Sequence, residues 1–357
     1  MTRIINFTKA INEAYFIAMN LNQKVLCYGL GVDDPKHIFN TTIGLQEKFG
    51  KERVFDMPTS ENAMTGVAIG ASLVGYRPIM VHQRLDFFLL AMDQLVNAAA
   101  KWHYMFGGQN SVPIVIRLII GRGWGQGPTH SQSLQSWFAH IPGLKVVMPS
   151  SPKEAKGLLL SSIFDENPVL FLEHRWLHNQ EEDVPEGDFR IPIGKANILQ
   201  EGSDLTILGM SYMNTEAIRC LGYLKLQGVS VELIDLRTVN PIDWSTIIGS
   251  VKKTGRLLVL DTGSETGSLA AEIIAKVSIE LFSEMVSPPA RICLPDVPVP
   301  AGFSLTKDFY PTSYDIAKKV CLMLDVVFNE KDFKYLSLIH ISEPTRLLSI
   351  SYAVFCL

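Results

Sequence analysis

Two side chains in the first half of the chain, Glu61 and His130, are of types that exchange protons with bound ligands. Glu61 precedes an almost wholly apolar run within VFDMPTSENAMTGVAIGASLVGYRPIMV, residues 54–81, which is typical of a helix packed beneath a strand. Carboxylates avoid a protein interior unless a partner binds them. In a helix capped by Thr59, Glu61 could instead compensate the helix dipole, which contributes about 0.3–1 kcal/mol. Considered alone, Glu61 is best explained by this structural role.

His130 lies near the end of a glycine-rich run, GRGWGQGPTHSQS, that covers residues 121–133. The run follows a predicted strand at its carboxyl end, where parallel α/β sheets place their ligands. The backbone amides of such a loop can bind phosphate, but no helix begins at the distance that a phosphate loop requires. His130 alone is as compatible with a structural hydrogen bond as with catalysis, and His140 is better explained as structural.

Phe87 and Phe88 form an aromatic pair at the head of a predicted helix. Such a pair is usually part of the core, but one ring could lie against a flat ligand. The sequence contains no GxGxxG after a strand, no GxxxxGKS/T loop, no HExxH and no GxSxG. Sites of those kinds for dinucleotides, nucleotides, zinc proteolysis and ester hydrolysis are therefore excluded.

The elements that position these residues alternate between β-rich and helical patterns, which predicts parallel sheets wound with helices. The predicted strands are 24–29, 77–83, 112–120, 144–150 and 168–173, then 203–210, 229–237, 256–263 and 290–296. The predicted helices are 7–21, 61–75, 87–106 and 152–165, the last begun by Ser151 and Pro152, then 213–227, 243–253, 267–284 and 312–325. We therefore predict an α/β protein with two doubly wound domains, 1–180 and 201–335, joined by a linker over 181–200.

The composition is that of a folded chain of two ordinary domains, with 357 residues, 47% hydrophobic and 19% charged. A formal net charge of -4 without a Lys/Arg run argues against nucleic-acid binding. No stretch approaches the roughly 18 apolar residues of a membrane span, and no signal peptide is evident. Five widely spaced cysteines without a CxxC pair favour neither a zinc site nor a disulfide framework, so we expect the reducing cytoplasm.

The last 22 residues, LSLIHISEPTRLLSISYAVFCL, differ in character from the charged segment before them. They read as a translation of sequencing-adapter DNA, and they lack a period that would pack against a core. We therefore expect residues 336–357 to be a non-native tail and exclude them from the fold prediction. The natural chain is expected to end near Tyr335 or to continue with residues that are missing.

Four stretches occur in the order and spacing of a known family. They are DMPTSENAMTGVAIGASLVGYRPI, AMDQLVNAAAKWHYMFGGQNSVPIVIR, THSQSLQSWFAHIPGLKVVMPSSPKEAKGLL and VSVELIDLRTVNPID. Together they resemble the β subunits of thiamine-diphosphate-dependent 2-oxo acid dehydrogenases, which act on pyruvate, branched-chain 2-oxo acids or acetoin. The chain is also similar to the pyrimidine-binding and C-terminal domains of transketolase. The likeness covers most of the chain, so it implies both the fold and the reaction class.

The resemblance implies a role for each candidate residue. The matching glutamate, Glu61, would hydrogen-bond N1′ of the cofactor's aminopyrimidine and favour the tautomer that deprotonates C2 of the thiazolium. Phe87 matches the aromatic residue that packs on the pyrimidine, and Gln83 is a further candidate for binding the cofactor. His130 matches the histidine of the active-site channel, which is suited to proton transfer or to holding the acyl acceptor. The implied reaction is oxidative decarboxylation of a 2-oxo acid, with acyl transfer to a lipoyl group.

The resemblance also implies a monovalent cation site, in which main-chain oxygens bind K⁺. The matching positions are Ile114, Ser162, Ile163, Asp165 and Asn167. The segment DENP that contains the last two is equally well explained as a turn that ends a helix.

A motif that thiamine-diphosphate enzymes use is absent from this sequence. Those enzymes hold the diphosphate through Mg²⁺ with a GDG motif, and the GD of this chain, Gly187-Asp188, lies in the predicted linker. We therefore expect an α-type partner subunit that carries the GDG motif and holds Mg²⁺, in an α₂β₂ assembly with the active site at the interface. A lipoyl acyltransferase core is a further expected partner.

Some residues depart from the family pattern, and two alternatives stay open. Arg122 and Trp124 stand where pyruvate-type members have small residues, and His174, Arg175 and Trp176 replace a pattern closer to EPKRLY. These changes leave the 2-oxo acid and the acyl acceptor undetermined. The chain could also be the C-terminal half of a split transketolase-like enzyme that transfers ketol groups, or a scaffold subunit without catalysis. The presence of Glu61 argues against the scaffold.

Overall fold

The computed structural model describes residues 3–121 and 125–334, and these residues form two compact units. The first unit contains the residues up to 121 together with 129–193 and 238–241, and the second unit contains the remainder. The predicted adapter-derived tail, and Arg122 and Trp124 of the glycine-rich run, lie outside the described residues. The predicted domain boundaries at residues 180 and 200 stay predictions.

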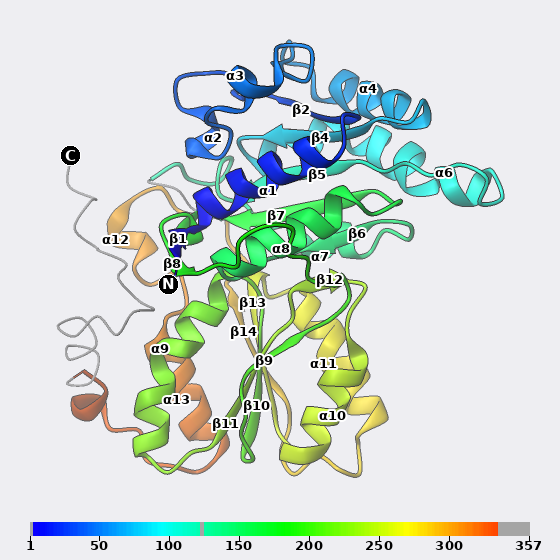
Figure 1. The fold of residues 1–357 in the computed structure, drawn as a ribbon. Coiled ribbons are helices and arrows are strands. Elements are labelled where there is room, and N and C mark those ends of the chain that lie inside the picture. Colours follow the sequence, from blue (N-terminus) through cyan, green and yellow to red (C-terminus); the bar gives the residue numbers. More distant parts are fainter. Residues whose placement is uncertain (1–2, 122–124, 335–357) are drawn as a thin grey trace. The chain divides into compact units, whose positions relative to one another are not determined.

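A seven-stranded sheet forms the centre of the first unit (Figure 1). In spatial order its strands are β12 (Thr238–Asn240), β6 (Lys145–Val147), β7 (Val169–His174), β5 (Val115–Ile120), β4 (Arg77–His82), β2 (Val25–Gly29) and β3 (Val54–Asp56). Strands β2 to β7 run parallel, and the edge strand β12 is antiparallel to β6. β5 and β7 are buried along their whole length, as is usual where helices cover both faces of a parallel sheet. The predicted α/β fold with mainly parallel sheets is confirmed.

Helices of the first unit pack on this sheet. α1 (Phe7–Leu21) packs against α8 (Pro152–Ile163), and α4 (Glu61–Leu73) packs on β4. The predicted cap of α8 is confirmed, because the hydroxyl of Ser151 accepts a hydrogen bond from the amide of Glu154 at 3.4 Å. Short elements complete the unit: α2 (His37–Asn40), whose residues all have positive φ, α3 (Leu45–Phe49), α7 (Gln135–Ala139) and the 3₁₀ turn η3 (Arg175–Leu177).

The predicted single helix over 87–106 is wrong in detail. The structure divides this region into α5 (Leu85–Phe88), the 3₁₀ turn η1 (Leu89–Ala91), the π-helix η2 (Gln94–Ala99) and α6 (Ala100–Met105). A π-helical turn adds a residue to the helical repeat and rotates the following residues around the axis. Apolar periodicity does not report such a change, because every segment of the region still buries an apolar residue.

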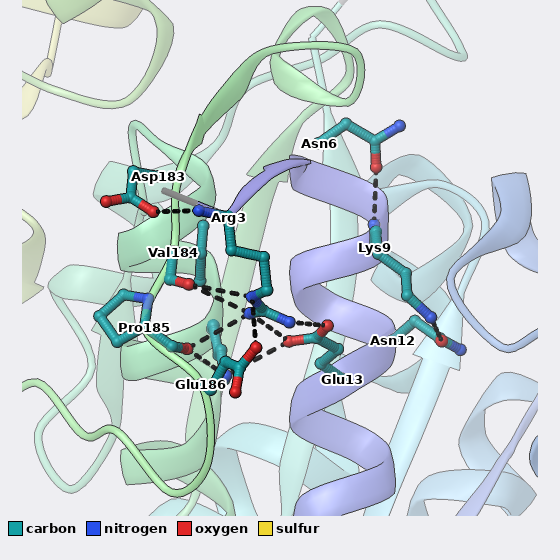
Figure 2. Close-up of polar contacts among 10 residues, drawn as sticks. Arg3, Asn6, Lys9, Asn12, Glu13, Asp183, Val184, Pro185 and Glu186 are labelled. Atoms are coloured by element: carbon teal, nitrogen blue, oxygen red, sulfur yellow. Dashed lines mark hydrogen bonds and ion pairs between the residues drawn. The ribbon is translucent and has the colours of Figure 1, made fainter. Parts of the chain in front are cut away.

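The amino terminus is fixed by a two-stranded sheet that the sequence pattern did not indicate, β1 (Ile4–Asn6) with β8 (Glu181–Asp183). Figure 2 shows the guanidinium of Arg3 beside α1, where it donates to the Glu13 carboxylate at 2.5 and 2.8 Å. The same guanidinium donates to the carbonyl of Val184 at 3.1 Å. This part of the predicted linker is therefore bound to the first unit.

The second unit contains a five-stranded sheet between two pairs of helices (Figure 1). In spatial order its strands are β14 (Ala290–Leu294), β13 (Leu257–Ser264), β10 (Leu205–Gly209), β11 (Val231–Asp235) and the antiparallel edge strand β9 (Asn197–Gln200). α9 (Tyr212–Leu226) and α13 (Ser313–Met323) pack together on one face, and α10 (Trp244–Thr254) and α11 (Leu269–Glu280) lie on the other. A short helix, α12 (Phe303–Thr306), follows β14.

A buried ion pair joins two central strands of the first sheet. Arg117 on β5 and Glu173 on β7 both have side chains without solvent exposure, and their charged atoms are 2.6 Å apart. The guanidinium also donates to the hydroxyl of Tyr15 on α1 at 3.0 Å and to that of Thr41 at 3.1 Å. Burying this charge is tolerable because hydrogen bonds surround it.

We expect Glu173→Gln to lower the free energy of unfolding by about 3–5 kcal/mol, because the Arg117 charge would stay buried without its counterion. Glu166→Gln is the matched control, because the Glu166 carboxylate pairs with Arg77 but is 61% exposed. Its loss should be below about 1 kcal/mol. Urea unfolding of the two variants would measure the difference, and equal losses would contradict this view of the Arg117–Glu173 pair.

Candidate active site

Glu61 is the first residue of α4, and it is 7% exposed. Ser60 occupies the cap position without a side-chain hydrogen bond to the helix, so the predicted cap by Thr59 is wrong. The Ser60 hydroxyl donates instead to the side-chain oxygen of Asn62 at 2.9 Å, and that oxygen also accepts from a helix amide. Among the described residues, none donates a hydrogen bond to the Glu61 carboxylate or forms an ion pair with it.

One hydrogen bond within α4 and one from the sheet beneath it hold the first turn of this helix. The hydroxyl of Thr65 donates to the carbonyl of Glu61 at 2.8 Å, and the buried Tyr28 hydroxyl on β2 donates to the carbonyl of Met64 at 3.0 Å. These bonds fix the backbone that carries Glu61 and leave its carboxylate uncommitted. A carboxylate without a partner, on a nearly buried residue that lines a pocket, is available to a ligand.

Phe87 on α5 and His130 on the loop after β5 are in contact, although 42 residues lie between them in the sequence. Their ring centroids are 5.1 Å apart and the ring planes cross at 89°, an edge-to-face arrangement. Phe87 is 38% exposed, whereas Phe88 is fully buried in the core. One ring of the aromatic pair is therefore accessible to a flat ligand.

Asp86 connects the two segments that carry Phe87 and His130. One of its carboxylate oxygens accepts from the side-chain amide of Gln132 at 2.8 Å and from the backbone amide of the same residue at 3.3 Å. The other oxygen is buried and has no hydrogen-bond partner among the described residues. Asp86 therefore determines where the histidine-bearing loop lies.

Glu61, Gln83 and Phe87 line one open pocket of about 500 Å³, a volume within the usual range for small-ligand sites. The described lining residues are Leu30, Gly31, Asp34, Asp56, Met57, Thr59, Glu61, His82, Gln83 and Phe87. His130 is not part of this lining, but it contacts Phe87 at the pocket. The structure thus brings together four of the predicted site residues.

The pocket is acidic. Asp34, Asp56 and Glu61 line it, and neither lysine nor arginine occurs among the described lining residues. The Asp56 carboxylate accepts from the backbone amides of Gly31 and Val32 at 3.0 and 2.6 Å. Burial, followed by the neighbouring acid Asp33, raises the pKa of Asp56. Such a pocket repels a diphosphate and admits a neutral or cationic group.

Gln83 reaches across a glycine at the pocket. Gly31 has φ +84°, and a Cβ atom built on it would lie 2.4 Å from the side-chain nitrogen of Gln83. Any other residue at position 31 would therefore strain the backbone and displace the Gln83 amide.

Family models for two domains match the chain. "Transketolase, pyrimidine binding domain" matches residues 4–180, and "Transketolase, C-terminal domain" matches residues 194–316. A relative from Cupriavidus necator, the acetoin:2,6-dichlorophenolindophenol oxidoreductase subunit beta, is 39% identical over 89% of this chain and 96% of its own. The chain belongs to the family of 2-oxo acid dehydrogenase β subunits.

Two more members of this family have a similar sequence identity to the chain. The pyruvate dehydrogenase E1 component subunit beta of Rhizobium meliloti is 41% identical, over 88% of this chain and 69% of its own. The mitochondrial 2-oxoisovalerate dehydrogenase subunit beta 2 of Arabidopsis thaliana is 42% identical, over 84% of each chain. A solved structure titled "Split gene transketolase, inactive beta4 tetramer" has a TM-score of 0.73 at 22% identity, covering 90% of this chain and 99% of that one, and shows a shared fold.

Of the positions predicted to bind K⁺, Ser162, Ile163, Asp165 and Asn167 lie at or just after the end of α8, and Ile114 immediately precedes β5. The carbonyl oxygens of Ile163 and Asp165 already accept from the guanidinium of Arg77, at 3.2 and 2.9 Å. The Asp165 carboxylate forms an ion pair with Lys145 at 2.5 Å and accepts from the backbone amide of Asn167 at 2.8 Å. Two positively charged side chains, Arg77 and Lys145, thus already bind these oxygens. A further cation would be repelled by them. The predicted K⁺ site stays a prediction, and these contacts count against it.

The described residues contain neither a cluster of metal-ligating side chains nor a helix that could span a membrane. In residues 3–121 and 125–334, no group of three or more His, Cys, Asp or Glu side chains could hold a metal ion. Every helix of these ranges is too short or too polar to cross a lipid bilayer.

Sequence reasoning missed three polar residues that line the pocket: Asp34, Asp56 and His82. His82 had a recognisable signal, because it is the polar residue that ends the apolar strand β4 at its carboxyl end. Asp56 had the same signal at the end of β3, but a strand of three residues is too short to be predicted from alternation. Asp34 lies in a loop and had no such signal.

We expect Asp86→Ala to separate His130 from the Phe87 ring, because the hydrogen bonds to Gln132 would be lost. In the NMR spectrum of the chain, the ring protons of His130 should lose the shift that the aromatic ring imposes on them. Asp93→Ala is the matched control, because Asp93 accepts from Asn97 at 2.7 Å on the exposed side of the same region. An unchanged His130 signal in Asp86→Ala would show that Asp86 does not position the loop.

Proposed function

We propose that the chain is the β subunit of a thiamine-diphosphate-dependent 2-oxo acid dehydrogenase and that Glu61 is its proton-exchanging residue. The observation that carries this proposal is the nearly buried residue Glu61, whose carboxylate has no partner among the described residues and lines a pocket that also exposes the Phe87 ring. When bound, thiamine diphosphate supplies the electron sink for decarboxylation of the 2-oxo acid. The products of the proposed reaction are carbon dioxide and an acyl group passed to a lipoyl group.

The residues of this chain fit the aminopyrimidine end of that cofactor. The Glu61 carboxylate would share a proton with the ring nitrogen N1′, since no residue described in the structure competes for it. Phe87 would cover one face of the flat ring, and Gln83 would offer its amide beside it. His130, in contact with Phe87, would hold or transfer a proton where the substrate enters.

The same pocket does not fit the diphosphate end. Its described lining is acidic and contains neither lysine nor arginine, and the sequence has no GDG motif. We therefore propose that an α-type partner subunit holds the diphosphate and Mg²⁺, in an α₂β₂ assembly. An exposed stripe of small and apolar residues on α4, made by Ala63, Gly66, Val67 and Gly70, lies next to Glu61 and supports a partner surface there.

The proposal also covers the group that accepts the acyl product and the cellular compartment in which the protein acts. A lipoyl group on an acyltransferase core is the proposed acceptor, by analogy with the pyruvate and 2-oxoisovalerate dehydrogenase relatives. Ketol transfer between phosphosugars is less well supported, because the described lining of the pocket offers no basic side chain to a phosphate. The four described cysteines are free thiols, which is compatible with a reducing compartment such as the cytoplasm.

We expect Glu61→Ala to slow hydrogen–deuterium exchange at C2 of the bound cofactor by about 10²–10⁴-fold, the usual contribution of a positioned acid or base. The measurement uses the chain assembled with its diphosphate-binding partner. Glu52→Ala, which removes an exposed glutamate of the same unit, is the control and should leave exchange unchanged. Normal exchange in an assembled Glu61→Ala complex would reject the role proposed for Glu61.

We also expect the isolated chain to bind thiamine diphosphate and Mg²⁺ much more weakly than its complex with a GDG-containing subunit encoded by a neighbouring gene. Calorimetric titration of the chain, the partner and the mixture would compare the three affinities. Tight binding by the isolated chain, with one cofactor per chain, would refute the shared active site. Turnover of pyruvate or a branched-chain 2-oxo acid, rather than of phosphosugars, would then identify the reaction.

A further inference from the structure

His82 is a buried histidine whose polar atoms have no hydrogen bonds in the described part of the chain. It is the last residue of β4, and it is 1% exposed. Both ring nitrogens are buried, and neither has a hydrogen-bond partner among the described residues. The ring packs against Phe88, with centroids 5.2 Å apart. Buried polar atoms in folded proteins nearly always have partners, and each exception requires an explanation.

The charge state of His82 limits what it can bind. Burial lowers the pKa of His82 to about 4, so the ring is neutral near pH 7. A neutral imidazole offers one N–H donor and one nitrogen acceptor. Because the two ring nitrogens point in different directions, a ligand would pair with one of them, as an acceptor or as a donor according to the tautomer. The neutral ring provides no charge with which to attract an anion.

A purely structural role explains His82 poorly. The two residues before it on β4, Met80 and Val81, are apolar and have no solvent exposure, and Phe88 packs on the imidazole. An apolar side chain of similar size would fill this place without leaving two polar atoms unpaired, each of which costs about 1–3 kcal/mol of stability. The two unpaired nitrogens thus destabilise the fold, and a ligand in the pocket would give one of them a hydrogen-bond partner.

The other residues that line the pocket indicate which kind of ligand could bind His82. His82 lines the same pocket as Glu61 and Phe87, and the other ionisable residues of the described lining are acids. A phosphate group would be repelled by Asp34, Asp56 and Glu61. A flat nitrogen heterocycle would instead use the Phe87 face, the Glu61 carboxylate and the imidazole together.

We propose that His82 is a second ligand-binding residue of this pocket and hydrogen-bonds a nitrogen heterocycle that Glu61 also contacts. The inference rests on the proposed function, in which that heterocycle is the aminopyrimidine of thiamine diphosphate. It assigns to His82 a direct contact that secures the ring, in addition to the proton exchange assigned to Glu61.

The test is the affinity of thiamine diphosphate, with Mg²⁺, for the chain assembled with its diphosphate-binding partner. His82→Phe should raise the Kd about tenfold, which corresponds to about 1.4 kcal/mol. His82→Gln, whose amide keeps a donor and an acceptor, should recover most of the affinity. Without ligand, the melting temperature of His82→Phe should equal or exceed that of the unchanged chain. His82→Leu gives the same comparison if the phenyl ring does not fit.

A cofactor analogue identifies the contact. If the pyrimidine of thiamine diphosphate is replaced by a benzene ring, His82→Phe should no longer weaken binding, because the edge that His82 contacts is missing. A Kd for His82→Phe and His82→Leu within twofold of the unchanged chain would overturn the inference, provided that Glu61→Ala and Phe87→Ala weaken binding. If none of these variants weakens binding, the proposed function fails together with the inference.

Discussion

The pocket depends on one geometric constraint, which is that neighbouring strands of the first sheet run parallel. β2, β3, β4 and β5 therefore end at the same edge, and the chain leaves each of them there. Asp56 and His82 are the terminal residues of two of these strands, and the loop after a third carries His130. The parallel sheet therefore brings residues that are far apart in the sequence to one site, and no direct contact between each pair of them is needed.

The elements with a long, clean period could be predicted from the sequence. The predicted helix at 7–21 has the same bounds as α1, because its apolar face and its cap at Asn6 are both local signals. The broken helix between residues 85 and 105 could not be predicted. Its π-helical turn changes which side of the helix faces the core, but the amino-acid composition of the segment gives no sign of this change. β1 and β8 were missed because strands of three largely unburied residues have no hydrophobic pattern.

Part of the candidate site could also be predicted, but from the order of motifs along the chain and not from local periodicity. Glu61, Phe87 and His130 are individually compatible with structural roles, and the order of motifs along the chain selected them. The edge-to-face contact between Phe87 and His130, and the part of Asp86 in it, depend on how two loops meet. His82 is the polar residue that ends β4, but that position alone does not separate a ligand-binding histidine from a core histidine, and its two unpaired ring nitrogens are seen only in the structure.

β12 shows that the two units cannot be separated by a single cut in the chain. This strand, Thr238–Asn240, comes after the first strands of the second unit in sequence, yet it forms the edge of the first sheet beside β6. A fragment ending at Ile193 would lack it and would expose the backbone of β6 as a free edge, which invites pairing between molecules. The first sheet is thus completed by a segment that the chain reaches only after β9, β10 and β11 of the second unit.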